Sequence, residues 1–235
     1  KIINGILWRL KTGVSWRDIP ERYGPWSTIY SRFFRWKRSG IWDQIFSAIL
    51  SQEDAQGCLD WDTHYVDSTI IRAHQHASVK KKGQESEALG YSQGGYSTKV
   101  HLRTDGNGKL ITLALTPGQR HETTAFYRLM ETGSVKRQGR GRPRIRPHRL
   151  IGDKAYSSRA MRKYLADHHI RFTIPRRIDE TRTGPFDKII YRLRNRIERF
   201  IHRMKHFRAI ATRFEKSASS YHTLWIIAAI FLWLQ

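Results

Sequence analysis

The sequence DKIIYRLRNRIERFIHRMKHF, residues 187–207, has the apolar spacing of a single amphipathic helix. At about 100° per residue, four polar residues fall on one side of this helix: Tyr191, Arg194, Glu198 and Lys205. Apolar residues fall on the opposite side: Leu193, Ile197, Phe200, Met204 and Phe207. We therefore expect the helix to pack its back against a core and to present the Glu198 carboxylate among cations.

Two interpretations of Glu198 are open at this point. The carboxylate can form surface ion pairs with neighbouring arginines, and such pairs are common and contribute little to stability. Alternatively, Glu198 is a metal-binding catalytic acid that lies beside cations in contact with DNA phosphates. The charge and the other motifs of the chain bear on this choice.

The charge of the chain indicates a polyanionic partner. Its 235 residues include 43 Lys and Arg against 20 Asp and Glu, which gives a formal net charge of +23. The basic residues are spread along the chain, so we expect a basic surface that binds nucleic acid rather than a membrane. Hydrophobic residues make up 39% of the sequence, enough for a packed core. Charge alone does not separate an enzyme from a basic binding protein.

Several classes of protein are disfavoured by the sequence. The single cysteine, Cys58, excludes an intrachain disulfide and a zinc site with several cysteines. There is no secretory signal, and no apolar run reaches the roughly 18 residues that would span a bilayer. We expect a cytoplasmic protein without a membrane partner, associated with the nucleoid through DNA. The chain starts without Met inside a helical pattern, so we expect an N-terminally shortened piece.

Residues 1–56 predict a small helical domain. Helices are expected at residues 2–10, 28–38 and 41–50, and Ser27 is a candidate N-cap of the second one. That second helix carries Arg32 and Arg35 on its outer side. Three short helices with a basic middle member resemble a helix-turn-helix module. DNA binding by this module and a plain helical cap on the next domain are equally open.

Residues 57–235 predict a mixed α/β domain. Strands are expected at residues 57–71, 97–104, 109–116, 150–156 and 170–174, with helices at 121–131 and 157–168 and a buried apolar helix at 224–234. The DGNG sequence at 105–108 is a strong hairpin signal. This order favours a mixed sheet with helices on its faces.

Two segments of this domain are expected to be irregular. Residues 77–96 are polar and rich in glycine, and we interpret them as a flexible loop that includes the lysines at positions 80–82. Residues 134–149 form a basic arm, which contains Arg140 and Arg142 and is expected to be disordered or extended along a phosphate backbone.

Three acids are distinguished by their positions. Asp67 is expected at the end of the first strand, Asp153 at the end of a later strand and Glu198 on the helix after the last strand. Three carboxylates in one pocket repel one another unless cations intervene, and Mg²⁺ suits such hard oxygen ligands. Two such ions can activate an attacking water or 3′-OH and stabilise the leaving oxygen in phosphodiester displacement. Lys154, next to Asp153, is a candidate phosphate contact.

The same residues resemble a known family. VDST (66–69), GDKAY (152–156) and NRIERF (195–200) are similar to motifs of bacterial insertion-sequence transposases of the DDE type. The family signature Y-x2-R-x3-E-x6-K is matched in full by Tyr191, Arg194, Glu198 and Lys205. The resemblance covers nearly the whole chain.

The resemblance implies an RNase H-like catalytic core whose metal-binding triad is Asp67, Asp153 and Glu198, with Mg²⁺ or Mn²⁺ as the cofactor. It also implies cleavage at the ends of an insertion sequence and transfer of the 3′-OH ends into target DNA. Tyr191, Arg194 and Lys205 would then contact the transposon ends, and a homodimer would pair two ends. The alternatives are a nuclease of similar core that cuts without joining and a catalytically silent DNA-binding regulator.

Overall fold

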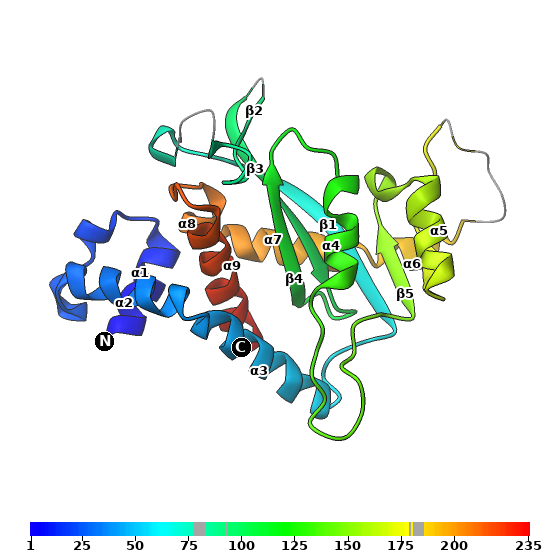
Figure 1. Cartoon of the computed structure of the whole chain (residues 1–235), viewed down its shortest axis with the longest axis horizontal. Helices are drawn as coiled ribbons and strands as arrows, with labels where there is room; N and C mark the ends of the chain where they lie inside the picture. The colour runs from blue at the N-terminus through cyan, green and yellow to red at the C-terminus, as the bar shows by residue number, and fades with distance from the viewer. Residues whose placement is uncertain (78–82, 93, 179, 181–185) are drawn as a thin grey trace.

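The computed structural model describes residues 1–77, 83–92, 94–178, 180 and 186–235 (Figure 1). The lysines at positions 80–82, in the loop expected at 77–96, lie outside these residues, as do residues 179 and 181–185. The rest of residues 77–96 is more ordered than the sequence suggested, because this segment contains a short strand and the start of the next one.

The centre of the molecule is a six-stranded mixed sheet in the order β2-β3-β1-β5-β6, with β4 paired to β3. Its strands are β1 (Thr63–Arg72), β2 (Gly90–Ser92), β3 (Gly95–Thr104), β4 (Leu110–Pro117), β5 (Arg149–Gly152) and β6 (Arg171–Thr173). β1, β3 and β4 form an antiparallel meander, whereas β5 and β6 run parallel to β1. This mixed sheet with helices on its faces confirms the predicted α/β fold class.

Helices cover both faces of the sheet (Figure 1). Because side chains alternate along a strand, Tyr65 of β1 joins one hydrophobic cluster and Val66 joins the other. The first cluster includes apolar residues of α7 (Asn195–Lys205), α8 (Arg208–Ala211) and α9 (Ala218–Trp233). The second includes those of α4 (Thr123–Glu131) and α5 (Arg159–Asp167). The sheet is therefore the middle of three layers.

Three N-terminal helices extend the first cluster away from the sheet: α1 (Ile2–Thr12), α2 (Trp26–Arg38) and α3 (Ile41–Ala55). Figure 1 shows them beside α8 and α9. An ion pair between Arg9 and Glu215 joins α1 to the segment between α8 and α9, with 2.5 Å between Nη2 and Oε1 and both side chains nearly buried. The N-terminal helices and the sheet thus share one continuous core.

Some boundaries differ from those expected. The second helix begins at Trp26 with Pro25 as its N-cap, so Ser27 lies inside the helix and does not cap it. α9 begins at Ala218 and is buried almost all round. Every helix in the described part of the chain is too short or too polar to cross a bilayer.

The helix expected at residues 187–207 is divided in two. α6 (Lys188–Arg192) and α7 are joined through Leu193 and Arg194, where backbone N–H groups bond three residues back rather than four. Ile197, Phe200 and Met204 are buried as the periodicity predicted, but Leu193 is 39% exposed and does not belong to the apolar stripe.

The DGNG segment forms the predicted hairpin turn between β3 and β4. Oδ1 of Asp105 accepts hydrogen bonds from the backbone N–H of Asn107 at 3.1 Å and of Lys109 at 2.7 Å. Gly108 has a φ of +81°, in the left-handed region that a residue with a side chain rarely adopts. The turn fixes the antiparallel register between β3, the neighbour of β1, and β4.

The basic arm at residues 134–149, all of which are described, forms neither a helix nor a strand before Arg149, where β5 begins, beyond an isolated bridge between Val135 and Arg144. It is anchored to α3, because Arg144 pairs with Asp54 at 2.9 Å and the Ser51 hydroxyl donates to the Lys136 carbonyl. The arm is therefore attached at its base rather than free along its length.

Candidate active site

Asp67 lies in the middle of β1 rather than at its end, because β1 continues to pair with β3 as far as Arg72. The parallel ladder with the short strand β5 stops earlier, at the pair Val66 and Gly152. Asp67 is the next residue of β1, and Asp153 directly follows the end of β5. The sheet therefore places the two aspartates at the same level, where β5 ends.

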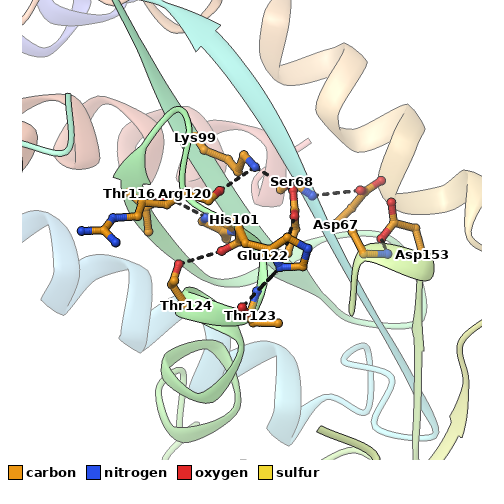
Figure 2. A network of polar contacts seen from close by, with 12 residues as sticks. Asp67, Ser68, Lys99, His101, Thr116, Arg120, Glu122, Thr123, Thr124 and Asp153 are labelled. Atoms are coloured by element: carbon orange, nitrogen blue, oxygen red, sulfur yellow. Dashed lines mark hydrogen bonds and ion pairs between the residues drawn. The ribbon is translucent and has the colours of Figure 1, made fainter. Parts of the chain in front are cut away.

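Asp153 begins the 3-10 turn Lys154–Tyr156, and its Oδ1 accepts a hydrogen bond from the Ala155 N–H at 2.9 Å. On the other side, Oδ1 of Asp67 accepts one from the Ser68 N–H at 2.8 Å. Figure 2 shows the two carboxylates next to each other. Each aspartate is thus oriented by a backbone N–H close to it in the chain.

Glu198 reaches this group through Arg194. Nη1 of Arg194 lies 2.8 Å from Oδ2 of Asp67, and Nη2 of the same guanidinium pairs with Oε1 of Glu198. The Asp67 side chain is 13% exposed and that of Glu198 is 44% exposed. The structure therefore brings Asp67, Asp153 and Glu198 to one place, with Arg194 bridging two of them.

The electrostatics of Asp67 reflect this crowding. The pKa of Asp67 is raised to about 6, mainly by burial and also by the charges of Asp153 and Glu198, against the opposing effects of Arg194 and the Ser68 N–H. Burial alone lowers the pKa of Arg194, but the charges of Asp67 and Glu198 outweigh it and raise that pKa. The site holds more negative charge than one guanidinium compensates.

The donor set suits a divalent cation. Carboxylate oxygens are the hard ligands that Mg²⁺ and related ions prefer, and the buried Asp67 carboxylate has an excess of negative neighbours. Within the described residues, no group of three His, Cys, Asp or Glu side chains is close enough to hold an ion as they stand. Arg194 lies between Asp67 and Glu198 instead. The residues fit such an ion by their chemistry, and Arg194 supplies the countercharge here.

A second polar network lies behind Asp67, on the opposite face of β1 (Figure 2). Lys99 of β3 pairs with Oε1 of Glu122 at 2.8 Å and also donates to the Arg120 carbonyl at 2.7 Å. The Ser68 hydroxyl donates to the same Glu122 oxygen at 3.1 Å. Although burial raises the pKa of Glu122, donation from Lys99 lowers it below its usual value. The ion pair holds the loop before α4 against β3, and the Ser68 hydroxyl holds it against β1, the strand that carries Asp67.

Two further buried side chains adjoin this network. Burial lowers the pKa of His101 to about 4, and its Nε2 lies 2.9 Å from the Thr116 hydroxyl. The phenol of Tyr156 is fully buried, and burial together with the charges of Asp67 and Glu122 raises its pKa well above the usual value. No sequence motif singled out Lys99, which lies in a strand of mixed polar and apolar residues.

The other predicted DNA-contact residues are distributed over the surface. The guanidinium carbon of Arg194 lies 5.8 Å from the centre of the Tyr191 ring, so Tyr191 adjoins the acids. Lys154 follows Asp153 and is exposed, whereas Lys205 is the last residue of α7 and takes part in none of the ion pairs seen among the described residues. Four arginines lie away from the acids: Arg32 and Arg35 on α2, and the exposed Arg140 and Arg142 on the arm.

Two family models match the chain. Residues 64–233 match "Transposase DDE domain", and residues 1–46 match "Putative transposase of IS4/5 family (DUF4096)". The first match spans more than half of the chain and includes all three acids.

Individual proteins are also similar over parts of the chain. "Uncharacterized protein y4sN" of Sinorhizobium fredii is 34% identical over 82 residues, which are 35% of this chain and 61% of that protein. "Putative transposase for insertion sequence element IS402" of Burkholderia cepacia is 31% identical over 121 residues, 52% of this chain and 55% of that protein. The chain thus spans little more than half the length of these curated relatives.

Among solved structures, the Mos1 transposase paired-end complex with left transposon end is 9% identical, with a TM-score of 0.29 over 88% of this chain and 79% of that one. A TM-score this low does not indicate a shared fold. The family match rests instead on residues 64–233, and because this model covers most of the chain, the chain belongs to the family of transposases with a DDE domain.

Proposed function

We propose that this chain is a DNA transposase that cuts at the ends of an insertion sequence and joins the freed 3′-OH ends to target DNA. The observation that carries the proposal is the convergence of Asp67, Asp153 and Glu198 around the Arg194 guanidinium. A buried acid with a raised pKa, such as Asp67, is typical of functional sites. The DDE domain depends in general on divalent metal ions, which such acids bind.

In this proposal Asp67, Asp153 and Glu198 hold the divalent ions, two Mg²⁺ or Mn²⁺ in the active complex. Ions at such a site lower the pKa of the attacking water or 3′-OH and stabilise charge on the leaving oxygen. The backbone N–H of Ser68 and that of Ala155 keep the two aspartates oriented. The network of Lys99 and Glu122 supports β1 from behind.

The DNA partner follows from the same reasoning. Tyr191, Arg194 and Lys205 bind the transposon end near the scissile phosphate, with Lys154 beside Asp153. Residues 1–56 form a helical DNA-binding unit through Arg32 and Arg35, and residues 57–235 form the catalytic unit, whose arm contacts DNA through Arg140 and Arg142. Their support is the net charge of +23 and the exposure of the arm. The protein acts as a homodimer on DNA, at the nucleoid in the cytoplasm.

The test uses labelled DNA that carries the element's ends, which are found by searching the DNA beside the coding region for inverted repeats. With Mg²⁺, joined products support a transposase. Products that are cut but never joined indicate a nuclease, and a gel shift without any product indicates a silent DNA-binding protein. Either of these two results would overturn the proposal.

The variant Glu198→Gln tests the role of the acids. It keeps the size of the side chain and removes a metal-binding charge, so the cleavage rate should fall more than about 100-fold. DNA binding in EDTA should stay close to that of the unaltered protein. Glu131→Gln, which changes an exposed glutamate at the end of α4, is the matched control and should cut normally. Normal cutting by Glu198→Gln would contradict the assignment.

A further inference from the structure

Beside the acids lies a basic pocket, of which the proposed function uses only Lys154. Its volume is about 650 Å³, and it is lined by His121, Lys154, Ala155, Arg176, Arg177 and Ile178. These six residues, which we call the Asp153-side pocket, come from three segments that are far apart in the sequence. Three of the six are permanent cations, and none of these described lining residues is a carboxylate.

The topology of the sheet explains why these segments meet. β4, β5 and β6 all run in the same direction as β1. His121 follows β4, Lys154 follows β5 and Arg176 follows β6, so each lies just past the carboxyl end of its strand. Open sheets bind ligands outside the carboxyl ends of parallel strands. The pocket is therefore in the usual position for a ligand site in such a sheet.

The pocket is attached directly to the acid group. Asp153 precedes Lys154. Ala155 also lines the pocket, and its backbone N–H donates to Oδ1 of Asp153. Arg194 approaches the acids from α7, on the face that Asp67 and Glu198 share. The acids thus have cations on two sides: Arg194 on α7 and the lysine and two arginines of the pocket beyond Asp153.

The segment that carries the two arginines is held in place. Oε2 of Glu180 accepts a hydrogen bond from the Arg177 N–H at 3.1 Å and pairs with Arg162 of α5 at 3.4 Å. The Ser157 hydroxyl also donates to this oxygen. Since Glu180 accepts the backbone N–H of Arg177, the main chain of the segment is anchored to the residues around α5.

Another basic pocket of similar size, about 590 Å³, lies at the base of the arm and serves as a comparison. Its lining also includes Asp60 and Asp62, and Asp62 pairs with His148 at 2.9 Å. Carboxylates in that lining oppose the binding of an anion. The Asp153-side pocket has none among its described lining residues and therefore suits a phosphate better.

We propose that the Asp153-side pocket binds the phosphodiester backbone of the DNA strand on the far side of the scissile phosphate from Arg194. This inference rests on the proposed function, since it assumes a DNA strand that crosses the acids. A strand whose reacting phosphate lies at Asp67 and Asp153 must continue in both directions. The pocket supplies the cations for one of them.

The first test is DNA binding by the full chain with Arg176→Ala and Arg177→Ala together. Binding of a fluorescent duplex is measured in EDTA over a range of salt, so that no cutting occurs. Each lost phosphate contact lowers the slope of log K against log salt by about 0.7–0.9, so we expect a reduction of about 1.5 and about tenfold weaker binding. The control is Lys163→Ala with Arg171→Ala, two exposed cations that do not line the pocket, and it should keep a steeper slope than the test variant.

Thermal unfolding shows whether the test variant is folded. If it is not, Lys154→Ala with Arg177→Ala replaces it, because Lys154 is exposed and both residues line the pocket. A folded variant with an unchanged slope overturns the proposal.

The second test locates the strand. Ala155→Cys in a Cys58→Ser background carries a photo-cross-linker, since Cys58 is the chain's one cysteine. Cross-links should fall on nucleotides to one side of the cut site only, and cross-links on both sides or none overturn the proposal. If the pocket variant loses DNA affinity while the unaltered chain never cuts, the proposed function fails and the pocket stands. If the chain cuts and joins while the pocket variant binds normally, the proposed function stands and the pocket proposal fails.

Discussion

Asp67 is held in an environment that disfavours its charged form. Its carboxylate is nearly buried, its neighbours include Asp153 and Glu198, and its main compensation is a single guanidinium at 2.8 Å. An ionised carboxylate in such an environment lowers the stability of the fold, which is common for groups at functional sites. The cost can be measured in the absence of metal.

We predict that Asp67→Asn stabilises the protein at neutral pH in EDTA. The pKa of Asp67 is about 6 in the folded chain, against 3.8 for an unperturbed aspartate. Ionisation of Asp67 therefore destabilises the folded state. The penalty is present in full above about pH 6, shrinks as the pH falls toward 3.8 and is absent below it. We expect a gain of about 1–3 kcal/mol at pH 7.5. Urea unfolding at several pH values measures it.

The exposed Asp167, paired with Lys163 on the surface of α5, provides the control. Asp167→Asn should change the free energy of unfolding by less than about 1 kcal/mol, because surface ion pairs contribute little. A destabilised Asp67→Asn protein at pH 7.5 would mean that the Arg194 ion pair outweighs the cost of burial.

At the level of single elements, the β3–β4 turn is where a glycine is required. Gly108 has a positive φ of +81°, and a Cβ added there would lie 2.9 Å from the Arg196 carbonyl oxygen of α7. The turn therefore touches the helix that carries Glu198. A substitution here should be felt by both elements.

We predict that Gly108→Ala lowers the free energy of unfolding by about 1–3 kcal/mol, from backbone strain and from the close contact with α7. Gly139→Ala is the matched change, since nothing lies within 4 Å of a Cβ built there and no positive φ applies. Chemical denaturation of both variants compares them. Equal stability of the two would show that the turn and α7 move apart without cost.

Elements also differ in how far the sequence could specify them. Helical periodicity identified the buried face of α7 through Ile197 and Phe200, because burial repeats along a regular helix. It could not detect the tighter turn at Leu193 and Arg194, which depends on tertiary contacts. For the same reason Asp67 was expected at a strand end: strand length is set by the partner β3, and a sequence does not reveal its partner.

The candidate site was predictable in part. Asp67, Asp153, Glu198 and Arg194 could be identified in the sequence because they belong to motifs. Their roles stay predictions. The side chains that support them could not be identified, since Lys99 meets Glu122 only through pairing of strands and a loop that are 23 positions apart. The same holds for Arg176, which reaches the Asp153-side pocket through the parallel pairing of β5 and β6.

At the scale of the whole molecule, the buried ion pair between Arg9 and Glu215 ties the N-terminal helices to the rest of the fold. We predict that Arg9→Met destabilises the protein by about 3–5 kcal/mol, because it leaves the Glu215 carboxylate buried without its partner. Arg9→Met with Glu215→Leu should cost less than the single change. Unfolding in urea, followed as a double-mutant cycle, gives the coupling energy.

Lys163→Met, which breaks an exposed pair, is the comparison and should cost less than about 1 kcal/mol. If Arg9→Met and Lys163→Met have equal effects, the N-terminal helices are not held by this pair.

The large hydrophobic cluster joins Ile6, near the start of the chain, to Trp233 in its last helix. The Trp233 indole N–H donates to the Leu110 carbonyl of β4 at 3.0 Å, so α9 seals the sheet directly. During translation the strands therefore leave the ribosome long before their cover is made, and the apolar face of β3 and β4 waits for it. Until α9 has emerged, this apolar face is exposed, and exposed apolar surface favours aggregation of a nascent chain.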